Sequence, residues 1–570
     1  MKILSLHCDY IKYEAVKKAL KSAELEKGQE GKHEIKDCLV VLSAVEKGDS
    51  LQIVPKIVEN IKDIASQVKA KKIVLYPYAH LSSNLSSPDV AVEILRATET
   101  ELAKEKYEVT RAPFGFYKEF ELRCKGHPLS ELSRSISLVE GEKGQEVKVT
   151  EEKYDAKQLL NQISRSKLDT SKLKENDHRI IGQKLDLFSF HDTAPGMVFW
   201  HPKGLIIYNE LISYWRDEHR KMGYQEISTP FVLDKKLWQI SGHWEKFKEN
   251  IFLTKYEGRD FAVKPMNCPG GMLVYKSKPH SYKELPMRVG EVGIVHRQEL
   301  SGTLAGLFRV IKITQDDAHI FCKEEQLESE ITCIIELIDS FYEKFGLKFD
   351  HVELSTRPEK RIGSEAIWDK AEAILESVLK KTKMKYKLNK GDGAFYGPKI
   401  DFHAIDSQGR TWQLSTIQLD FAMPERFDLT YTDENNKEQR PVMLHRVIYG
   451  SLERFAGILI EHLNGNFPLW LSPNQVKVMT LTDRNIPAAE IIFEKLKDVG
   501  IRVELDIRTE TMDRKVRDAQ MDKFNFMVTI GDKEEEKGTI AVRSREGKVK
   551  FGIKLEDFIK ELKQLIEERK

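Results

Sequence analysis

The sequence predicts a multidomain protein of α+β and α/β domains, with an antiparallel β-sheet in its largest domain. First, 570 residues are too many for one hydrophobic core, so two to four domains are expected. Second, several strand-like runs follow one another around residue 400, which favours an antiparallel sheet over a doubly wound parallel one. Third, strand-like and helix-like pieces alternate near both ends of the chain, which is typical of smaller α/β domains.

Composition indicates a globular protein without a membrane anchor. Hydrophobic residues make up 41% and charged residues 32% of the chain. The net charge is +1, from 91 basic and 90 acidic residues, so no overall basic excess points to nucleic acid, although a balanced sum can hide a local patch. No apolar run approaches the roughly 20 residues that span a bilayer, and Asp9 interrupts the short apolar start, so a cytoplasmic location and no membrane partner are expected.

The cysteines argue against a disulfide scaffold. They are scattered and contain no C-x-x-C pair. The six are Cys8, Cys38, Cys124, Cys268, Cys322 and Cys333.

Residues 1–145 alternate strands and helices. The runs "LVVLSAV" and "KIVLYPY" are typical of strands, and the segment between them has helical apolar spacing at Ile57, Ile61 and Ile64. Residues 146–177 are polar and rich in Lys, Glu, Ser and Gln, which predicts a linker.

Residues 178–467 form the largest block, in which long helices alternate with strand-like runs. Residues 468–570 begin with the strand "QVKVMTLT", followed by a helix that should end at Gly500. Two further strands complete a small β-α-β-α-β unit. The apolar face of the helix comprises Ala488, Ile492, Leu496 and Val499.

One cysteine stands in an unusual context. In "KPMNCPG", Gly270 and Gly271 predict a turn around Cys268. Turns favour Asn, Asp, Gly and Pro, each for a backbone reason that cysteine lacks. Taken alone, this stretch is explained by a small buried hydrophobic residue at the end of a strand.

Arginines mark two further segments. Arg297 and Glu299 are predicted to alternate on one strand, with Arg309 on the return strand after a Ser-Gly loop. Guanidinium groups on one face suit phosphate oxygens, although an exposed hairpin with solvated charges explains the pattern equally well. Gly450, one turn before Arg454 on an amphipathic helix, would place a helix N-terminus and an arginine near phosphate.

Together with the strand "GYQEISTP", which ends at Pro230, these segments resemble the three motifs of class II aminoacyl-tRNA synthetases. The phrases "KPMNCPG", "TQDDAHIFC", "LSTRPEKRIGS" and "WQLSTIQLDF" narrow the resemblance to threonyl-tRNA synthetases over residues 178–570. The resemblance implies a catalytic domain at 178–467, built on an antiparallel sheet flanked by helices, and an α/β anticodon-binding domain at 468–570. It implies ATP-dependent activation of L-threonine and its transfer to the 3′ end of tRNA(Thr).

The family resemblance also explains the cysteine. Threonyl-tRNA synthetases hold one Zn²⁺ per chain with one Cys and two His, which correspond to Cys268, His319 and His445. Three N/S ligands leave a coordination position open for a substrate. Threonine and valine have nearly the same shape, which an apolar pocket separates weakly, whereas a metal that binds the hydroxyl requires it. Of the other histidines, His280, His296 and His403 are expected to be ordinary polar residues.

Further roles follow from the resemblance alone. ATP, accompanied by Mg²⁺, would contact Arg297 at the α-phosphate, Glu299 at the adenine, and Arg309 and Arg454 at the outer phosphates. Threonine would be surrounded by Asp317, Gln315, Tyr396 and Gln418, with Gln413 and Lys399 as candidates for the pocket wall.

The two ends carry their own resemblances. Residues 1–145 are similar to the archaeal threonyl-tRNA synthetase editing domain, itself similar to D-aminoacyl-tRNA deacylases, and imply removal of serine from mischarged tRNA. The implied editing residues are His80, Tyr117, Lys118 and Glu131. The C-terminal domain resembles the anticodon-binding domain of class IIa synthetases, with Arg517, Glu534 and Arg543 as base readers; charged residues on a solvated face are the alternative.

Two alternatives remain at this stage: a synthetase-like protein that binds tRNA without aminoacylating it, and a prolyl or seryl enzyme of the same class. Motif 1, which here is the helix before Gly223 plus "YQEISTP", predicts a homodimer. The sequence departs from common family forms at Ala305 and Ile311, where a histidine and an arginine are frequent, and at Gly271, where bacterial members often have a histidine.

Overall fold

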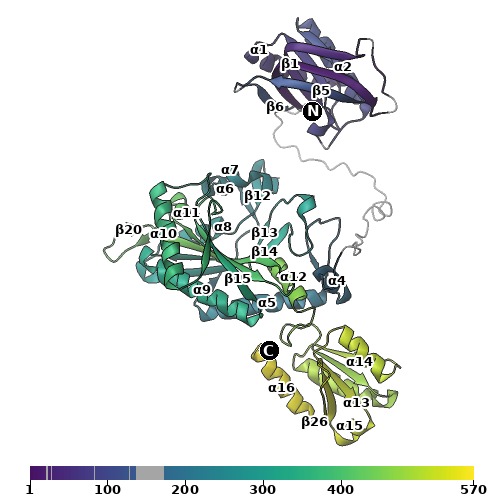
Figure 1. The fold of residues 1–570 in the computed structure, drawn as a ribbon, viewed down its shortest axis with the longest axis vertical. Coiled ribbons are helices and arrows are strands. Elements are labelled where there is room, and N and C mark those ends of the chain that lie inside the picture. The colour runs from purple at the N-terminus through teal and green to yellow at the C-terminus, as the bar shows by residue number, and fades with distance from the viewer. Residues whose placement is uncertain (21–22, 27, 83, 128, 137–172) are drawn as a thin grey trace. The chain divides into compact units, whose positions relative to one another are not determined.

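The structure is a computed structural model that describes residues 1–20, 23–26, 28–82, 84–127, 129–136 and 173–570. It contains two compact units, unit 1 (Met1–Lys153) and unit 2 (Tyr154–Lys570), which are described separately below (Figure 1). Most of the predicted linker, 146–177, lies outside the described residues. Among the described residues, no helix is long and apolar enough to cross a membrane.

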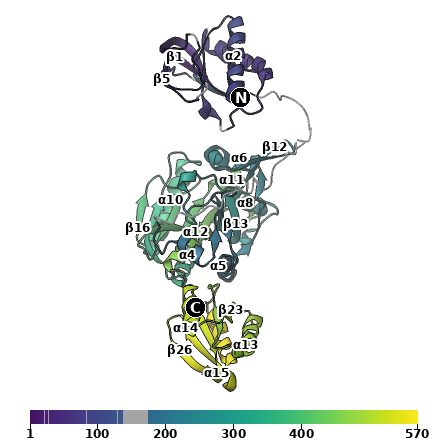
Figure 2. The same cartoon turned by 90° about the vertical axis from the view of Figure 1, so that its right-hand side faces the viewer.

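Unit 1 is one sheet with helices packed on a single face. Its strand order is β4-β3-β2-β1-β5, and β6 also pairs with β1. Figure 2 shows α2 on one side of this sheet. The predicted helical spacing is confirmed, because Ile57, Ile61 and Ile64 are all buried on α1. The elements are β1 (Lys2–Lys18), β2 (Lys32–Ala44), α1 (Val54–Val68), β3 (Lys72–Pro77), η2 (Ala79–Leu81), α2 (Pro88–Lys104), β4 (Glu108–Arg111), β5 (Phe116–Cys124) and β6 (Glu131–Ser135).

An eight-stranded sheet lies at the centre of unit 2, in the order β16-β15-β17-β18-β21-β14-β13-β9. All its neighbours pair antiparallel except the two outermost pairs, β15 with β16 and β13 with β9. The predicted antiparallel sheet is therefore confirmed. The strands are β9 (Gln225–Glu226), β13 (Met287–His296), β14 (Lys312–Cys322), β15 (Lys348–Ser355), β16 (Tyr386–Asn389), β17 (Lys399–Ile405), β18 (Thr411–Asp420) and β21 (Val442–Val447).

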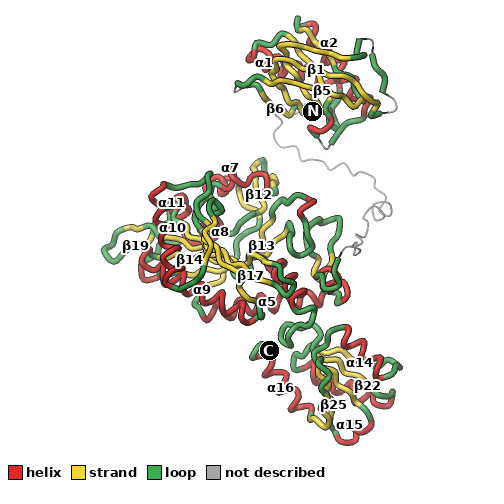
Figure 3. The backbone as a smooth tube through the Cα atoms, viewed as in Figure 1, coloured by secondary structure: helices red, strands yellow, loops and turns green. Residues whose placement is uncertain are grey.

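The two faces of this sheet differ in chemistry. One face, with residues such as Ile320, Phe402 and Ile417, packs in a single apolar cluster with four helices, of which α5, α9 and α10 are labelled in Figure 3. Because side chains alternate along a strand, the residues between them, including Asp317 and His319, point to the opposite face, here called the polar face. The helices are α5 (Pro202–Lys221), α9 (Leu327–Lys344), α10 (Glu365–Lys381) and α12 (Leu452–His462).

Shorter elements surround the sheet. A three-stranded sheet of order β10-β12-β11 precedes helix α8, which leads to β13. These elements are α4 (His178–Lys184), β7 (Phe188–Ser189), β8 (Phe199–Trp200), β10 (Val232–Asp234), α6 (Lys235–Ser241), α7 (His243–Phe247), β11 (Leu253–Tyr256), β12 (Arg259–Val263), α8 (Cys268–Lys276), α11 (Ala422–Arg426), β19 (Tyr431–Thr432) and β20 (Glu438–Gln439).

The C-terminal part confirms the predicted β-α-β-α-β unit and extends it by two strands and two helices. Its sheet order is β23-β22-β24-β25-β26. On α13, Leu496 is buried, and Ala488, Ile492 and Val499 pack against the same core. The elements are β22 (Val476–Thr480), α13 (Ile486–Asp498), β23 (Val503–Asp506), α14 (Met512–Met521), β24 (Phe526–Ile530), α15 (Asp532–Lys537), β25 (Ile540–Ser544), β26 (Val549–Ile553) and α16 (Leu555–Glu567).

The arginine hairpin exists, but its strand assignment was wrong. β13 ends at His296 and β14 begins at Lys312, so Arg297, Glu299 and Arg309 all lie in the connecting loop. The chain leaves the sheet because the backbone of Gln298 is hydrogen-bonded to Asn250. The backbone amide of Gln298 donates to the Asn250 carbonyl at 2.8 Å, and the backbone carbonyl of Gln298 accepts from Asn250 Nδ2 at 2.9 Å.

Candidate active site and editing cavity

Four candidate residues form one row across the polar face of the central sheet. His319 on β14 is paired directly with His445 on β21, His445 with Gln418 on β18, and Gln418 with Lys399 on β17. Directly paired residues of antiparallel strands point to the same face and lie close together. The register of the sheet therefore assembles residues that lie far apart in the sequence.

Cys268 reaches this row from a helix. It is the first residue of α8, so the turn predicted at this position is wrong. Pro269 fits the first turn of a helix, and the amides of Gly270 and Gly271 both donate to the Asn267 carbonyl, at 3.0 and 3.2 Å. The glycines permit close packing: a Cβ on Gly270 would lie 2.9 Å from Thr229 Cβ, and one on Gly271 would lie 3.4 Å from His319 Nδ1.

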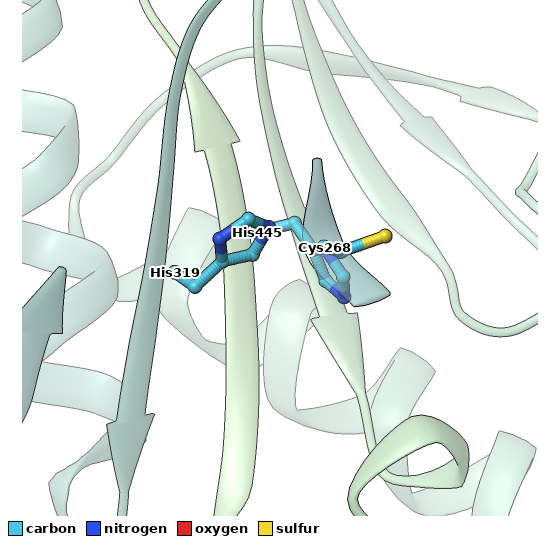
Figure 4. A group of neighbouring side chains, drawn as sticks. All are labelled: Cys268, His319 and His445. Atoms are coloured by element: carbon cyan, nitrogen blue, oxygen red, sulfur yellow. The ribbon is translucent and has the colours of Figure 1, made fainter. Parts of the chain in front are cut away.

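The cysteine and the two histidines meet at one point (Figure 4). All three are buried, and their ligand atoms lie within 4.8 Å of one another. His445 Nε2 pairs with Asp420 Oδ2 at 2.9 Å, which leaves Nδ1 for a metal. His319 Nε2 is buried without a hydrogen-bond partner. This donor set suits Zn²⁺, and a metal would satisfy the orphaned nitrogen.

Protonation states agree with this assignment. Burial lowers the pKa of His319 to about 4, so its imidazole is neutral and able to bind a metal near neutral pH. Burial also raises the pKa of the Cys268 thiol, with Asp317 and Asp420 adding to the effect. A buried thiolate beside two carboxylates needs a cation to stabilise it, and a divalent metal supplies that charge.

A cavity of about 140 Å³ opens beside these three side chains. Its lining includes the predicted residues Gln315, Asp317, Tyr396 and Gln418, together with Cys268, Arg297 and His445.

Lys399 and Gln413 do not line this cavity. Both contact the buried carboxylate of Asp401, Gln413 through its Nε2 at 2.6 Å. Thr416, which does line the cavity, donates to the same carboxylate at 2.9 Å. Lys399 and Gln413 therefore support the wall through Asp401.

The predicted phosphate-binding arginines gather near the cavity. Arg297 is half-buried, and its Nε donates to the Pro265 carbonyl at 3.2 Å. Arg454 lies in the first turn of α12 and donates to the Phe308 carbonyl at 2.9 Å. Burial lowers the pKa of Arg454, and the neighbouring charge of Arg309 lowers it further. Arg309 itself pairs with Glu299 at 2.8 Å. Such a cluster of positive charge favours a polyanionic ligand.

Sequence reasoning missed the residues that hold these groups in place. Asp316 is buried and accepts hydrogen bonds from the amides of Ile448, Tyr449 and Gly450 at 2.8, 3.1 and 3.0 Å, which fixes the segment before α12. The one available signal was its place on the strand, where it alternates with Ala318 and Ile320 and so shares the face of these apolar residues. Met266, Thr416, Arg446 and Val447 also line the cavity and carried no signal.

Asp420 offers a direct test of this support. Its Oδ1 accepts from the amides of Ala422 and Met423, while its Oδ2 pairs with His445. Asp420→Asn can keep the first two bonds but presents an amide to His445. Outer partners of metal-binding histidines typically contribute 10- to 100-fold to affinity, so zinc affinity should fall by about that factor. Competition with a chromophoric chelator measures it.

Asp406→Asn provides the matched control, because Asp406 is also buried but bonds Arg410 and Trp412 instead. Its zinc affinity should equal that of the wild type. Equal affinity in Asp420→Asn would show that Asp420 does not orient a metal ligand.

Unit 1 contains a larger cavity, of about 510 Å³. Its lining includes His80 on η2, Tyr117 and Lys118 on β5, and the aromatic rings of Tyr76 and Phe120. Lys118 Nζ donates to the carbonyls of Pro113 and Phe116 at 2.9 and 3.3 Å and lies 4.9 Å from the centre of the Tyr76 ring. Burial lowers the pKa of Lys118 to about 8.

Glu131 is not brought into this cavity. It is exposed on β6, where it pairs with Leu6 of β1. The anticodon candidates come from three elements: Arg517 is exposed on α14, Glu534 lies on α15, and Arg543 lies on β25. Glu534 has a structural task, since its carboxylate accepts from the Gly531 amide at 3.2 Å and caps α15.

Three known families match successive parts of the chain. Residues 1–136 match the archaea-specific editing domain of threonyl-tRNA synthetase. Residues 252–463 match the class II tRNA synthetase core domain (G, H, P, S and T), and residues 475–565 match an anticodon binding domain.

Individual relatives point to the same family as these domain matches. The chain is 54% identical over 396 residues to a threonine–tRNA ligase of Desulfatibacillum aliphaticivorans, covering 70% of this chain and 62% of that protein. The corresponding ligase of Carboxydothermus hydrogenoformans is 55% identical over 398 residues, with the same coverage. The chain thus spans about 62% of the length of these curated relatives.

Solved structures extend the comparison. A crystal structure described as the RNA binding domain of threonyl-tRNA synthetase from Cryptosporidium parvum is 38% identical, with a TM-score of 0.66, and the match covers 68% of this chain and 98% of that one. A putative threonyl-tRNA synthetase from Aeropyrum pernix is 29% identical, with a TM-score of 0.61, over 69% of this chain and 96% of that one. With its editing, core and anticodon-binding regions in this order, the chain belongs to the threonyl-tRNA synthetase family.

Proposed function

We propose that this protein is a threonine–tRNA ligase that activates L-threonine with ATP and transfers it to tRNA(Thr). The observation that carries the proposal is the buried group Cys268, His319 and His445, of which Cys268 and His445 line a small cavity, together with the nearby arginines Arg297, Arg309 and Arg454. The family membership supports the same conclusion. No feature of the described residues favours a protein that binds tRNA without aminoacylating it.

Zinc would be held by Cys268, His319 and His445. When bound, it would coordinate the amino and hydroxyl groups of threonine, which makes the hydroxyl obligatory. Around it, Asp317 and Gln315 would orient the substrate through hydrogen bonds, and Asn267, which donates to Asp317 at 3.2 Å, holds that carboxylate in position. Tyr396 and Gln418 would complete the pocket.

ATP would bind next to this pocket with Mg²⁺. Arg297 would contact the α-phosphate, and Arg309 and Arg454 the outer phosphates. Because Arg309 pairs with Glu299 in the structure, adenine binding at Glu299 would release Arg309 toward phosphate. The threonine carboxylate would attack the α-phosphate of ATP, which forms threonyl-adenylate and releases pyrophosphate. The tRNA's terminal ribose hydroxyl would then attack the carbonyl carbon of the adenylate and release AMP. No protein nucleophile is required, so catalysis rests on positioning and charge stabilisation.

The two ends would supply proofreading and tRNA selection. Serine also carries a hydroxyl and is smaller than threonine, so the pocket cannot reject it and a second site must hydrolyse seryl-tRNA. We assign this task to residues 1–145, with His80, Tyr117 and Lys118 at the ester; the exposed position of Glu131 gives it no contact there. Residues 178–467 would catalyse charging, with 146–177 as a linker, and 468–570 would read the anticodon through Arg517, Arg543 and Glu534.

Amino acid-dependent exchange of pyrophosphate into ATP tests the proposal. Threonine should support exchange, serine should support it measurably, and valine should be rejected by on the order of 10⁴, the discrimination typical of a site that binds a substrate hydroxyl. AMP formation that requires both threonine and tRNA completes the assay. Exchange with proline, or none with threonine, would overturn the proposed activity.

We expect the protein to form a homodimer through α5 and the segment around Pro230. A two-fold contact would use the same surface of both copies. Sedimentation at micromolar concentration should give twice the chain mass of 65.9 kDa. A fully active monomer would contradict this expectation.

A further inference from the structure

Two further histidines lie at the outer end of the polar face, on β15 and β17. His351 is paired directly with His403, and their rings stack with centroids 4.3 Å apart and planes inclined by 11°. Glu353 lies two residues from His351 and therefore on the same face. The ligand atoms of these three residues all lie within 4.8 Å of one another. From the sequence alone, His403 is expected to be an ordinary polar histidine.

The hydrogen bonds of this cluster leave one ring nitrogen without a partner. His351 Nδ1 pairs with Asp350 Oδ2 at 2.7 Å and its Nε2 with Glu353 Oε1 at 3.1 Å. His403 Nε2 is buried, has no hydrogen-bond partner, and lies 3.7 Å from Glu353 Oε2. A buried, unsatisfied nitrogen facing a carboxylate is costly in an otherwise bonded cluster.

A second cluster of similar composition, Asp177, His178 and Glu461, differs because both ring nitrogens of its histidine have partners. His178 pairs with Glu461 through Nδ1 at 2.6 Å, and its Nε2 accepts from the Leu307 amide at 3.0 Å. Both ring nitrogens are thus used, and the residue holds α4 against α12. The cluster on β15 and β17 has no such complete set of partners.

We propose that His351, Glu353 and His403 bind a divalent transition-metal ion, with Zn²⁺ as the natural candidate. Two imidazoles and a carboxylate form a donor set that zinc accepts while keeping a position open. Nitrogen ligands disfavour Mg²⁺ and Ca²⁺, which prefer oxygen. Asp350 would act as the outer partner that fixes the His351 ring, leaving Nε2 for the metal.

Accessibility separates this site from the cavity at Cys268. The side chains of His351, Glu353 and His403 are 19%, 21% and 17% exposed, so an ion can enter directly from solvent. The site has no thiolate. It should therefore bind zinc more weakly than the Cys268 group and exchange it more readily. A bound ion would join two neighbouring strands of the central sheet.

Calorimetric titration of the metal-stripped full-length protein with Zn²⁺ alone tests the proposal. The wild type should show two sites, one tight and one weaker. The double variant His351→Gln/His403→Gln should lose the weaker site and keep the tight one. Cys268→Ala should lose the tight site and keep the weaker one. His191→Gln, at a half-buried histidine outside both clusters, should retain both sites.

Glu353→Gln is a second test variant, which keeps the proposal testable if the double variant does not fold. The amide oxygen can still accept from Asn389 Nδ2, which donates to Glu353 at 2.9 Å, while the carboxylate ligand is lost. Zinc affinity of the weaker site should fall at least tenfold. A single zinc per wild-type chain at saturation, or a weaker site unchanged in both variants, would overturn the proposal and leave the cluster a hydrogen-bonded histidine pair.

Discussion

Replacing Cys268 with alanine should abolish threonine activation. The variant removes the only thiol of the three-residue group, and the imidazoles of His319 and His445 alone would hold zinc weakly. Since loss of a mere outer partner typically costs 10- to 100-fold, loss of a direct ligand should cost at least about 100-fold in both zinc affinity and threonine-dependent exchange. Metal analysis and pyrophosphate exchange on the same sample measure the two effects together.

Cys322→Ala is the matched control for this experiment. Cys322 is also a buried thiol, on β14, but it belongs to the apolar core. Its replacement should leave zinc content and threonine activation at wild-type levels. Full zinc content at the tight site in Cys268→Ala, with activation intact, would remove the metal hypothesis for this cavity.

Lys118→Met should allow seryl-tRNA to accumulate while leaving threonine activation unchanged. The lysine lines the cavity of unit 1, whereas the activation site is built entirely from unit 2. Loss of one group that stabilises an oxyanion typically costs 10²- to 10³-fold, so hydrolysis of pre-made seryl-tRNA should slow by about 100-fold. Lys36→Met, at a lysine whose side chain is 75% exposed, should hydrolyse it normally.

The same lysine predicts a pH dependence. Its pKa is lowered to about 8, so the side chain is charged below this pH and neutral above it. If the positive charge polarises the ester, wild-type hydrolysis, corrected for the uncatalysed reaction, should decline as pH rises through 8. A chelator should stop charging before it stops this hydrolysis, because the editing role proposed for His80, Tyr117 and Lys118 uses no metal. If the Lys118→Met variant forms no seryl-tRNA in the presence of tRNA and excess serine, the N-terminal domain is not a proofreader.

Local patterns predicted the elements better than the positions of the site residues. Spacing on α1 and α13 identified buried faces correctly, because those faces depend only on helical periodicity. The loop at Arg297 and the helix at Cys268 were misassigned, because both depend on distant partners: Asn250 diverts the first, and Thr229 packs against the glycines of the second. Asp316 bonds backbone amides such as that of Ile448, and Asp420 bonds His445. Only the folded sheet brings these partners near the two aspartates.

The direct pairing of His319 with His445, and of His445 with Gln418, ties metal capture to the folding of the central sheet. A slip of one residue between β14 and β21 would turn one histidine to the opposite face. A misregistered molecule could not assemble the Cys268 group, so it would remain free of metal at that position. Tight zinc content in a purified sample would then measure the fraction of molecules whose strands are correctly aligned, independently of any assay of activity.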